Sequence, residues 1–148
     1  MTAPFIMLVD DEVSFVETMA KRLAKRNIKT IVAFSAEEGL EKLKENQDLD
    51  VIVLDIKMPG MDGIDALKEI KTLSPLVEVI MLTGHATIES AIDAMKLGAH
   101  DFLMKPFDIE ELVLKMEEAA EKKQRHEEKI KEAFKAETLA KYGPFYYT

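Results

Sequence analysis

Short, fully apolar runs alternate along the chain with segments in which apolar residues recur every three or four positions. The runs Phe5–Val9 and Val51–Leu54 contain no polar residue, which is typical of strands that helices cover on both faces. Val16, Met19 and Leu23 have the spacing of one helix face. The pattern predicts strands at residues 5–9, 28–34, 51–54, 77–82 and 101–104, each followed by a helix.

Three helix ends carry recognisable capping residues. Ser35–Glu38 and Asp108–Glu111 both have the spacing of a capping box, in which the first side chain accepts a hydrogen bond from the N–H three residues later. Gly98 stands where the fourth helix should end, and glycine readily adopts the left-handed conformation that closes a helix. These residues predict the start of the second and fifth helices and the end of the fourth.

Five strands alternating with five helices predict an α/β protein with a parallel sheet. Right-handed crossovers place the helices on both faces of such a sheet. We therefore expect a doubly wound, three-layer α/β/α sandwich. The 148 residues suffice for one domain with a short appendage, and a second independent domain does not fit.

Composition excludes several classes of protein. The sequence contains no cysteine, which excludes disulfides, catalytic thiolates and cysteine-based zinc sites. No apolar run approaches the roughly 18 residues of a membrane span, and Met1–Val9 lacks the basic region of a signal peptide. We therefore expect a cytoplasmic protein without membrane contact.

Charge is distributed unevenly. The net charge is −8, which argues against general affinity for nucleic acid or anionic lipid and leaves cation binding open. From Glu117 onward acids and bases balance at seven each, so the acidic excess lies in residues 1–116. The acidic part of the chain is thus the predicted sandwich.

Polar residues follow four of the predicted strands. Asp10 and Asp11 follow the first, Asp55 the third, Thr83 the fourth and Lys105 the fifth. The carboxyl ends of parallel strands meet at one edge of the sheet, where ligands bind in open α/β folds. Three acids gathered there repel one another unless a cation neutralises them. Because these candidate ligands are all oxygens, the set favours Mg²⁺.

The same residues predict phosphoryl chemistry. Thr83 can donate a hydrogen bond to a phosphoryl oxygen, and Lys105 supplies a compact positive charge. A carboxylate facing these groups and Mg²⁺ is set up to attack phosphorus and form an acyl phosphate. Asp55 is the expected nucleophile, since it stands alone while Asp10 and Asp11 form a pair suited to holding metal. Taken singly, each of these residues could equally be an ordinary surface or strand-capping residue.

Four segments together resemble the receiver domain of two-component response regulators. They are Val9–Glu12, Leu54–Gly63, Ile80–Gly84 and Gly98–Phe107, and the resemblance covers about residues 4–120. It implies a flavodoxin-like sheet of strand order 2-1-3-4-5, Mg²⁺ as cofactor and a sensor histidine kinase as partner. It implies that Asp55 is the phosphoacceptor and that Thr83 and Lys105 contact the phosphoryl group. It also implies that Asp11, Asp55 and the Lys57 backbone carbonyl bind Mg²⁺ directly, and that Asp10 binds it through water.

The resemblance also implies a switch. Phe102 occupies the position of the family's switching aromatic, which moves together with Thr83, although it could also be a plain core residue. We expect a cis peptide bond between Lys105 and Pro106, which would aim the lysine into the site. Lys57 and His85 are expected to tune the lifetime of the phosphoryl group. The signal should leave through the face made by the fourth helix, fifth strand and fifth helix.

The end of the chain differs in character. We assign residues 1–120 to the receiver domain and residues 121–148 to a charged helical extension with an aromatic tail. A heptad pattern through the last helix is interrupted by Lys123 and His126. Homodimerisation through this helix or the signalling face is therefore one alternative, and a solvated extension is the other. The sequence leaves open whether the chain is a single-domain regulator or part of a longer protein.

Two other functions compete with a phosphorylation switch. A metal-dependent phosphohydrolase would need a second acid placed to activate water, and no Asp-x-Asp pair follows the first or third strand. A receiver-like binding module without chemistry should have lost Asp11, Asp55 or Lys105, and all three are present. The sequence therefore favours the switch, which is not an enzyme in the ordinary sense.

Overall fold

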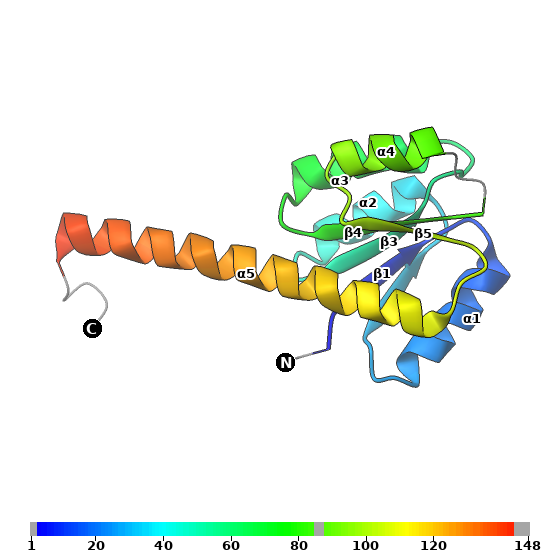
Figure 1. The fold of residues 1–148 in the computed structure, drawn as a ribbon, viewed down its shortest axis with the longest axis horizontal. Coiled ribbons are helices and arrows are strands. Elements are labelled where there is room, and N and C mark those ends of the chain that lie inside the picture. The colour runs from blue at the N-terminus through cyan, green and yellow to red at the C-terminus, as the bar shows by residue number, and fades with distance from the viewer. Residues whose placement is uncertain (1–2, 85–87, 144–148) are drawn as a thin grey trace.

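Strands and helices alternate throughout the part of the chain that the computed structural model describes, which is residues 3–84 and 88–143 (Figure 1). Each predicted strand and helix is present there. The elements are β1 Ile6–Val9, α1 Val13–Ala24, β2 Thr30–Ala33, α2 Ala36–Glu45, β3 Val51–Asp55, α3 Gly63–Leu73, β4 Glu78–Thr83, α4 Ile88–Lys96, β5 Asp101–Met104 and α5 Ile109–Tyr142.

The strands form one parallel sheet of order β2-β1-β3-β4-β5. Both the doubly wound sandwich and its strand order are thus confirmed. Strand β3 is central, with β1 and β4 on either side, and its last residue, Asp55, pairs in register with Leu82 of β4. The central position places Asp55 between the ends of two neighbouring strands.

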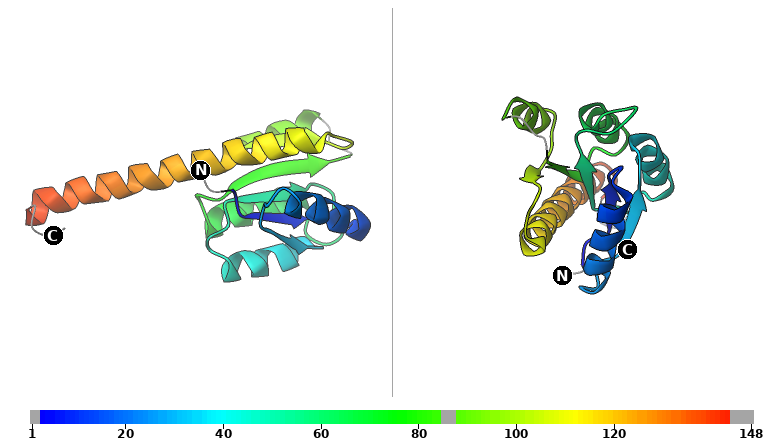
Figure 2. Two further views of the ribbon diagram at one scale, coloured as in Figure 1. Left: turned by 90° about the horizontal axis from the view of Figure 1, so that it is seen from below. Right: turned by 90° about the vertical axis from the view of Figure 1, so that its right-hand side faces the viewer.

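Helices cover both faces of the sheet, as the end-on view in Figure 2 shows. Alternate strand residues point to opposite faces, so Ile6 and Leu8 pack with α1 and α5, while Met7 and Val9 pack in the core beneath α2, α3 and α4. These four side chains are at most 2% exposed. Burial of each such side chain contributes roughly 1.5–3 kcal/mol. The two cores hold the sheet between its helices and fix its carboxyl edge.

Two of the three predicted helix caps form as expected. Ser35 accepts a hydrogen bond from the Glu38 N–H at 3.1 Å, and Gly98 adopts a φ of 99°. The capping box at Asp108 was predicted wrongly, because its side chain accepts no capping bond from the described residues. The Asp108 carbonyl instead accepts from the Glu111 N–H at 3.0 Å. This backbone bond already satisfies the N–H that the side chain would have bound.

Helix α4 leaves exposed most of the apolar residues whose spacing predicted it. Only Ala91 and Ala94 are buried, whereas Ile88, Ile92 and Met95 are 81%, 48% and 43% exposed. The apolar spacing therefore predicts the helix correctly but not the face that it buries. The exposed side chains give α4 an apolar outer surface.

Helix α5 continues without a break past the boundary predicted at residue 120. It has 34 residues, or about 51 Å at 1.5 Å per residue, and its second half projects beyond the sheet (Figures 1 and 2). Ile109, Leu112 and Met116 are buried against the sheet, while Ile130 and Phe134 on the projecting part are more than half exposed. Of the helices in the described residues, none combines the length and apolar character of a membrane span.

Candidate functional site

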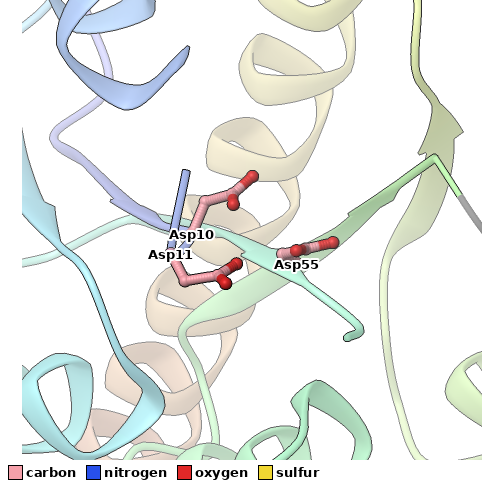
Figure 3. A group of neighbouring side chains, drawn as sticks. All are labelled: Asp10, Asp11 and Asp55. Atoms are coloured by element: carbon pink, nitrogen blue, oxygen red, sulfur yellow. The ribbon is translucent and has the colours of Figure 1, made fainter. Parts of the chain in front are cut away.

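The polar residues predicted after the strands converge at the carboxyl edge of the sheet. Asp10 follows β1, Asp55 ends β3, Thr83 ends β4 and Lys105 follows β5. Figure 3 shows the carboxylates of Asp10, Asp11 and Asp55 gathered between the ends of β1 and β3. One carboxylate oxygen from each of these residues lies within 4.8 Å of the others. Oxygen ligands at this separation suit a hard divalent cation.

A small cavity opens beside this cluster. Its volume is about 210 Å³, and Asp11, Glu12, Asp55, Lys57, Gly84 and Lys105 line it. Asp55 is 6% exposed and Asp10 is 2% exposed, whereas Asp11 is exposed to solvent. The cavity thus gives solvent access to a carboxylate that is otherwise nearly covered.

Burial makes Asp55 a much weaker acid than usual. The pKa of Asp55 is raised to about 7, chiefly by burial; the charges of Asp10 and Asp11 contribute to this rise, and the charge of Lys105 opposes it. Removing water from around a carboxylate disfavours its charged form, and neighbouring anions do the same. A cation bound beside the three carboxylates would offset both effects.

Lys105 forms the basic side of the site. Its ammonium donates to Asp10 Oδ2 at 2.6 Å and to Glu12 Oε1 at 3.2 Å. Burial acts to lower the pKa of Lys105, but the hydrogen bond and charge of Asp10, with Glu12 and Asp55, raise it overall. Lys105 therefore remains charged inside the site.

Gly63 holds the loop after β3 close to Asp55. A β-carbon at this position would lie 2.2 Å from the Asp55 carbonyl oxygen and 2.7 Å from the Ile56 α-carbon. The Gly63 N–H donates to the Ile56 carbonyl at 2.7 Å. Only glycine allows this approach of two backbones, so the start of α3 fixes the strand end that carries Asp55.

The remaining predicted site residues are Thr83, Phe102, the Lys105–Pro106 peptide bond and His85. Thr83 is 1% exposed at the end of β4, and Phe102 of β5 is 37% exposed beside α4. The peptide bond between Lys105 and Pro106 is cis. His85 lies outside the described residues.

Comparison with known proteins identifies the family. The model of the response regulator receiver domain matches residues 6–117. The chemotaxis protein CheY of Listeria monocytogenes is 38% identical over 116 residues, which cover 77% of this chain and 97% of that protein. The chain belongs to the response regulator receiver domain family.

Solved structures agree with this assignment. A receiver domain protein from Clostridium thermocellum has a TM-score of 0.78 and 36% identity, and the match covers 82% of this chain and 97% of that one. A CheY-like receiver domain from Methanospirillum hungatei has a TM-score of 0.79 and 29% identity, with 84% and 99% covered. The sandwich described above is therefore the receiver fold.

Other relatives are much longer proteins. The transcriptional regulatory protein ZraR of Escherichia coli is 37% identical over 114 residues, which cover 77% of this chain but only 26% of that protein. The chain thus spans about a quarter of the length of these relatives. Receiver domains are signalling modules of two-component systems and not classical enzymes. Phosphoryl acceptance and Mg²⁺ binding at an acidic pocket are typical of the family.

Two residues of this receiver domain were missed by sequence reasoning. Glu12 binds Lys105, and the Phe15 ring lies 4.2 Å from the Lys105 ammonium, measured to the ring centroid. Glu12 could have been suspected because it continues the acidic run after β1. Nothing in the sequence pairs Phe15 with a lysine 90 positions later, since that contact depends on how α1 packs beside the end of β5.

Proposed function

We propose that this receiver domain is a phosphorylation switch whose Asp55 accepts a phosphoryl group from a sensor histidine kinase. The observation that carries the proposal is the convergence of Asp55, Asp11 and Lys105 on one small cavity, with the Asp10 carboxylate beside the other two. An Asp55 carboxylate oxygen attacks phosphorus as the bond from phosphorus to the kinase histidine nitrogen breaks. The nitrogen keeps the electron pair, and Asp55 becomes an acyl phosphate.

The acidic residues would hold Mg²⁺. Asp11, Asp55 and the Lys57 backbone carbonyl are the proposed direct ligands, and Asp10 is the proposed ligand through water. The bound ion supplies positive charge that neutralises the phosphoryl oxygens and keeps Asp55 ionised near neutral pH. The support is the close set of carboxylate oxygens and the place of Lys57 in the cavity wall.

Thr83 and Lys105 are the proposed contacts of the phosphoryl group. Charge-assisted hydrogen bonds to it exist only in the phosphorylated form, so they can shift the conformational equilibrium. Movement of Thr83 toward the phosphoryl group would vacate space beside Phe102 and let this ring turn inward. Lys57 and His85 are the proposed regulators of phosphoryl lifetime, because each follows a site residue by two positions.

The proposed output surface is the face formed by α4, β5 and α5. An apolar groove of about 570 Å³ lies on it, and inward movement of Phe102 would reshape the groove. The groove supports output by contact with a protein partner, and the net charge of −8 argues against nucleic acid and anionic membranes. The groove is lined by Ile88, Ala91, Ile92, Met95, Lys96, Phe102 and Met104.

We treat residues 1–120 as the receiver domain and residues 121–148 as its extension. Homodimerisation through the α4, β5 and α5 face or through the extension is part of the proposal. Exposed Ile130 and Phe134 on α5 support it, because apolar side chains on a projecting helix gain stability from a partner surface. The phosphohydrolase alternative gains no support, since the 210 Å³ cavity is smaller than the roughly 300–1,000 Å³ of typical small-molecule sites.

Intact mass spectrometry after incubation with acetyl phosphate and Mg²⁺ tests the acceptor. The chain should gain one phosphoryl group, and Asp55→Asn should gain none. Asp65→Asn, which changes an exposed aspartate of α3, is the matched control and should label like the parent chain. Labelling of Asp55→Asn, or equal labelling of the parent chain in excess chelator, would contradict the proposal.

A further inference from the structure

Among the described residues, three groups contact the Lys105 ammonium, and two of them lie at the start of α1. Asp10 and Glu12 accept its hydrogen bonds at 2.6 and 3.2 Å, and the Phe15 ring centroid lies 4.2 Å away. The Lys105 side chain is only 15% exposed. A cation held over an aromatic face in a partly desolvated place is attracted to the ring more strongly than on an open surface.

The Phe15 ring is itself held in place. Phe107, just after β5, packs edge-on against it with ring centroids 6.2 Å apart and an interplanar angle of 78°. This edge-to-face arrangement is one that aromatic pairs prefer. The face of Phe15 is thereby kept toward Lys105, while Phe107 itself makes no cation–π contact with the ammonium among the described residues.

The ring and the two carboxylates act differently on Lys105. Asp10 and Glu12 occupy the N–H donors that phosphoryl oxygens would need. An aromatic face attracts the positive charge but takes no hydrogen bond of comparable strength, so the donors stay available. Glu12 is also 63% exposed, and ion pairs at such positions contribute little. The ring is therefore the better shielded of the two α1 contacts.

We propose that Phe15 is a positioning residue for Lys105. It keeps the ammonium beside the cavity while the N–H donors pass from Asp10 and Glu12 to the phosphoryl oxygens. Without the ring, the flexible lysine side chain would have to be ordered during the reaction, and the rate would fall. This inference rests on the proposed phosphorylation of Asp55.

Rates of phosphorylation by acetyl phosphate with Mg²⁺ test the inference. Phe15→Leu removes the ring but keeps an apolar side chain, and the rate should fall about three- to tenfold. Phe107→Leu removes the support of the Phe15 ring but leaves the ring itself, and it should lower the rate by less than Phe15→Leu does. In a Lys105→Ala background, Phe15→Leu should have no further effect, because its effect passes through the lysine. Equal losses with and without Lys105 would overturn the inference.

Fluorinated phenylalanines at position 15 separate charge attraction from shape. Each added fluorine weakens the negative face of the ring while the side chain stays nearly the same size, so the rate should fall stepwise. An unchanged rate across the series would overturn the inference. If the parent chain takes no phosphoryl group at all, the proposed function fails. The ring contact is then tested by the NMR shift of the Lys105 ε-methylene protons, which should move upfield in the parent chain and not in Phe15→Leu.

Discussion

Asp55 must be ionised to act as a nucleophile, but its surroundings favour the protonated form when no metal is bound. A nucleophilic carboxylate must be ionised, yet burial and two neighbouring aspartates favour its protonated form and raise its pKa to about 7. Lys105 offsets these effects only in part, because its ammonium is engaged by Asp10 and Glu12. The site therefore has an unmet need for positive charge, which is the physical reason to expect a divalent cation there.

The raised pKa of Asp55 predicts how stability depends on pH in chelator. The stabilisation from a protonated Asp55 is fully present below its unfolded pKa of about 4, and it is lost as pH rises toward 7. Asp55→Asn, which cannot ionise, should therefore be more stable than the parent chain at pH 8 by about 1–2 kcal/mol, allowing for solvent screening. The difference should shrink as pH is lowered to 5.

Urea unfolding at both pH values measures this difference, and saturating Mg²⁺ should reduce it at pH 8 by stabilising only the parent chain. Asp65→Asn serves as the control and should show no such dependence. A gain in stability of Asp55→Asn that is the same at pH 5 and pH 8 would mean that Asp55 is ionised throughout.

The close backbone contact at Gly63 predicts that a larger residue there destabilises the fold. Gly63→Ala would place a methyl group 2.2 Å from the Asp55 carbonyl oxygen, and backbone cannot yield as a flexible side chain can. We expect a loss of about 2–4 kcal/mol, measured by urea unfolding. Gly84→Ala meets only an ordinary contact at 3.9 Å from the Lys105 β-carbon and should cost far less. Similar losses for both would show that the loop after β3 can shift.

At the scale of elements, the buried carboxylate of Glu78 ties α3, α5 and the loop before β5 to the amino end of β4. Glu78 is 3% exposed, and Lys71 of α3, His100 before β5 and Lys122 of α5 lie 3.6, 3.6 and 3.0 Å from its oxygens. Its Oε2 accepts no hydrogen bond from the described residues, so Lys122 holds that oxygen by charge alone. Burial lowers the pKa of Lys71, although the charge of Glu78 acts to raise it.

Glu78→Gln keeps the size of the side chain and removes its charge, which leaves Lys71 and Lys122 facing each other. We expect a loss of about 1–3 kcal/mol in urea unfolding, below the loss for a fully buried pair because both lysines reach solvent. Glu41→Gln breaks an exposed pair with Lys44 and should change stability by less than about 0.5 kcal/mol. An unchanged stability in Glu78→Gln would mean that water, and not charge, satisfies these lysines.

Sequence reasoning predicted the elements and the meeting of the residues that follow the strands, but it did not predict contacts that depend on how side chains pack. The apolar runs, the Ser35 cap and the acids after β1 and β3 are each readable within a few residues. The partners of Glu78 stand at positions 71, 100 and 122, so only the packed fold brings them together. The apolar spacing of α4 predicted a helix, but its packing through Ala91 and Ala94 depends on the neighbouring elements.

At the scale of the whole molecule, α5 belongs both to the receiver domain and to its extension. Lys122 and Lys123 lie just past residue 120, yet Lys122 pairs with Glu78 and Lys123 pairs with Asp50 at 3.2 Å. Lys123 is also bound by Glu127, one turn later at 3.0 Å, and its side chain is 11% exposed. The helix is therefore clamped to the amino edge of the sheet at the point where it leaves the domain.

This clamp predicts that the boundary at residue 120 is too early for full stability. A chain ending at residue 120 should lose about 1–3 kcal/mol relative to the full chain, because Asp50 and Glu78 lose their partners. A chain ending at residue 128 keeps both lysines and Glu127 and should match the full chain. Replacing Lys122 and Lys123 by methionine in that chain should return it to the stability of the shorter one, which separates the ion pairs from helix length. If the chain ending at residue 120 is as stable as the full chain, then α5 is held by its apolar face alone, and its projecting half would be free to change direction without cost to the domain.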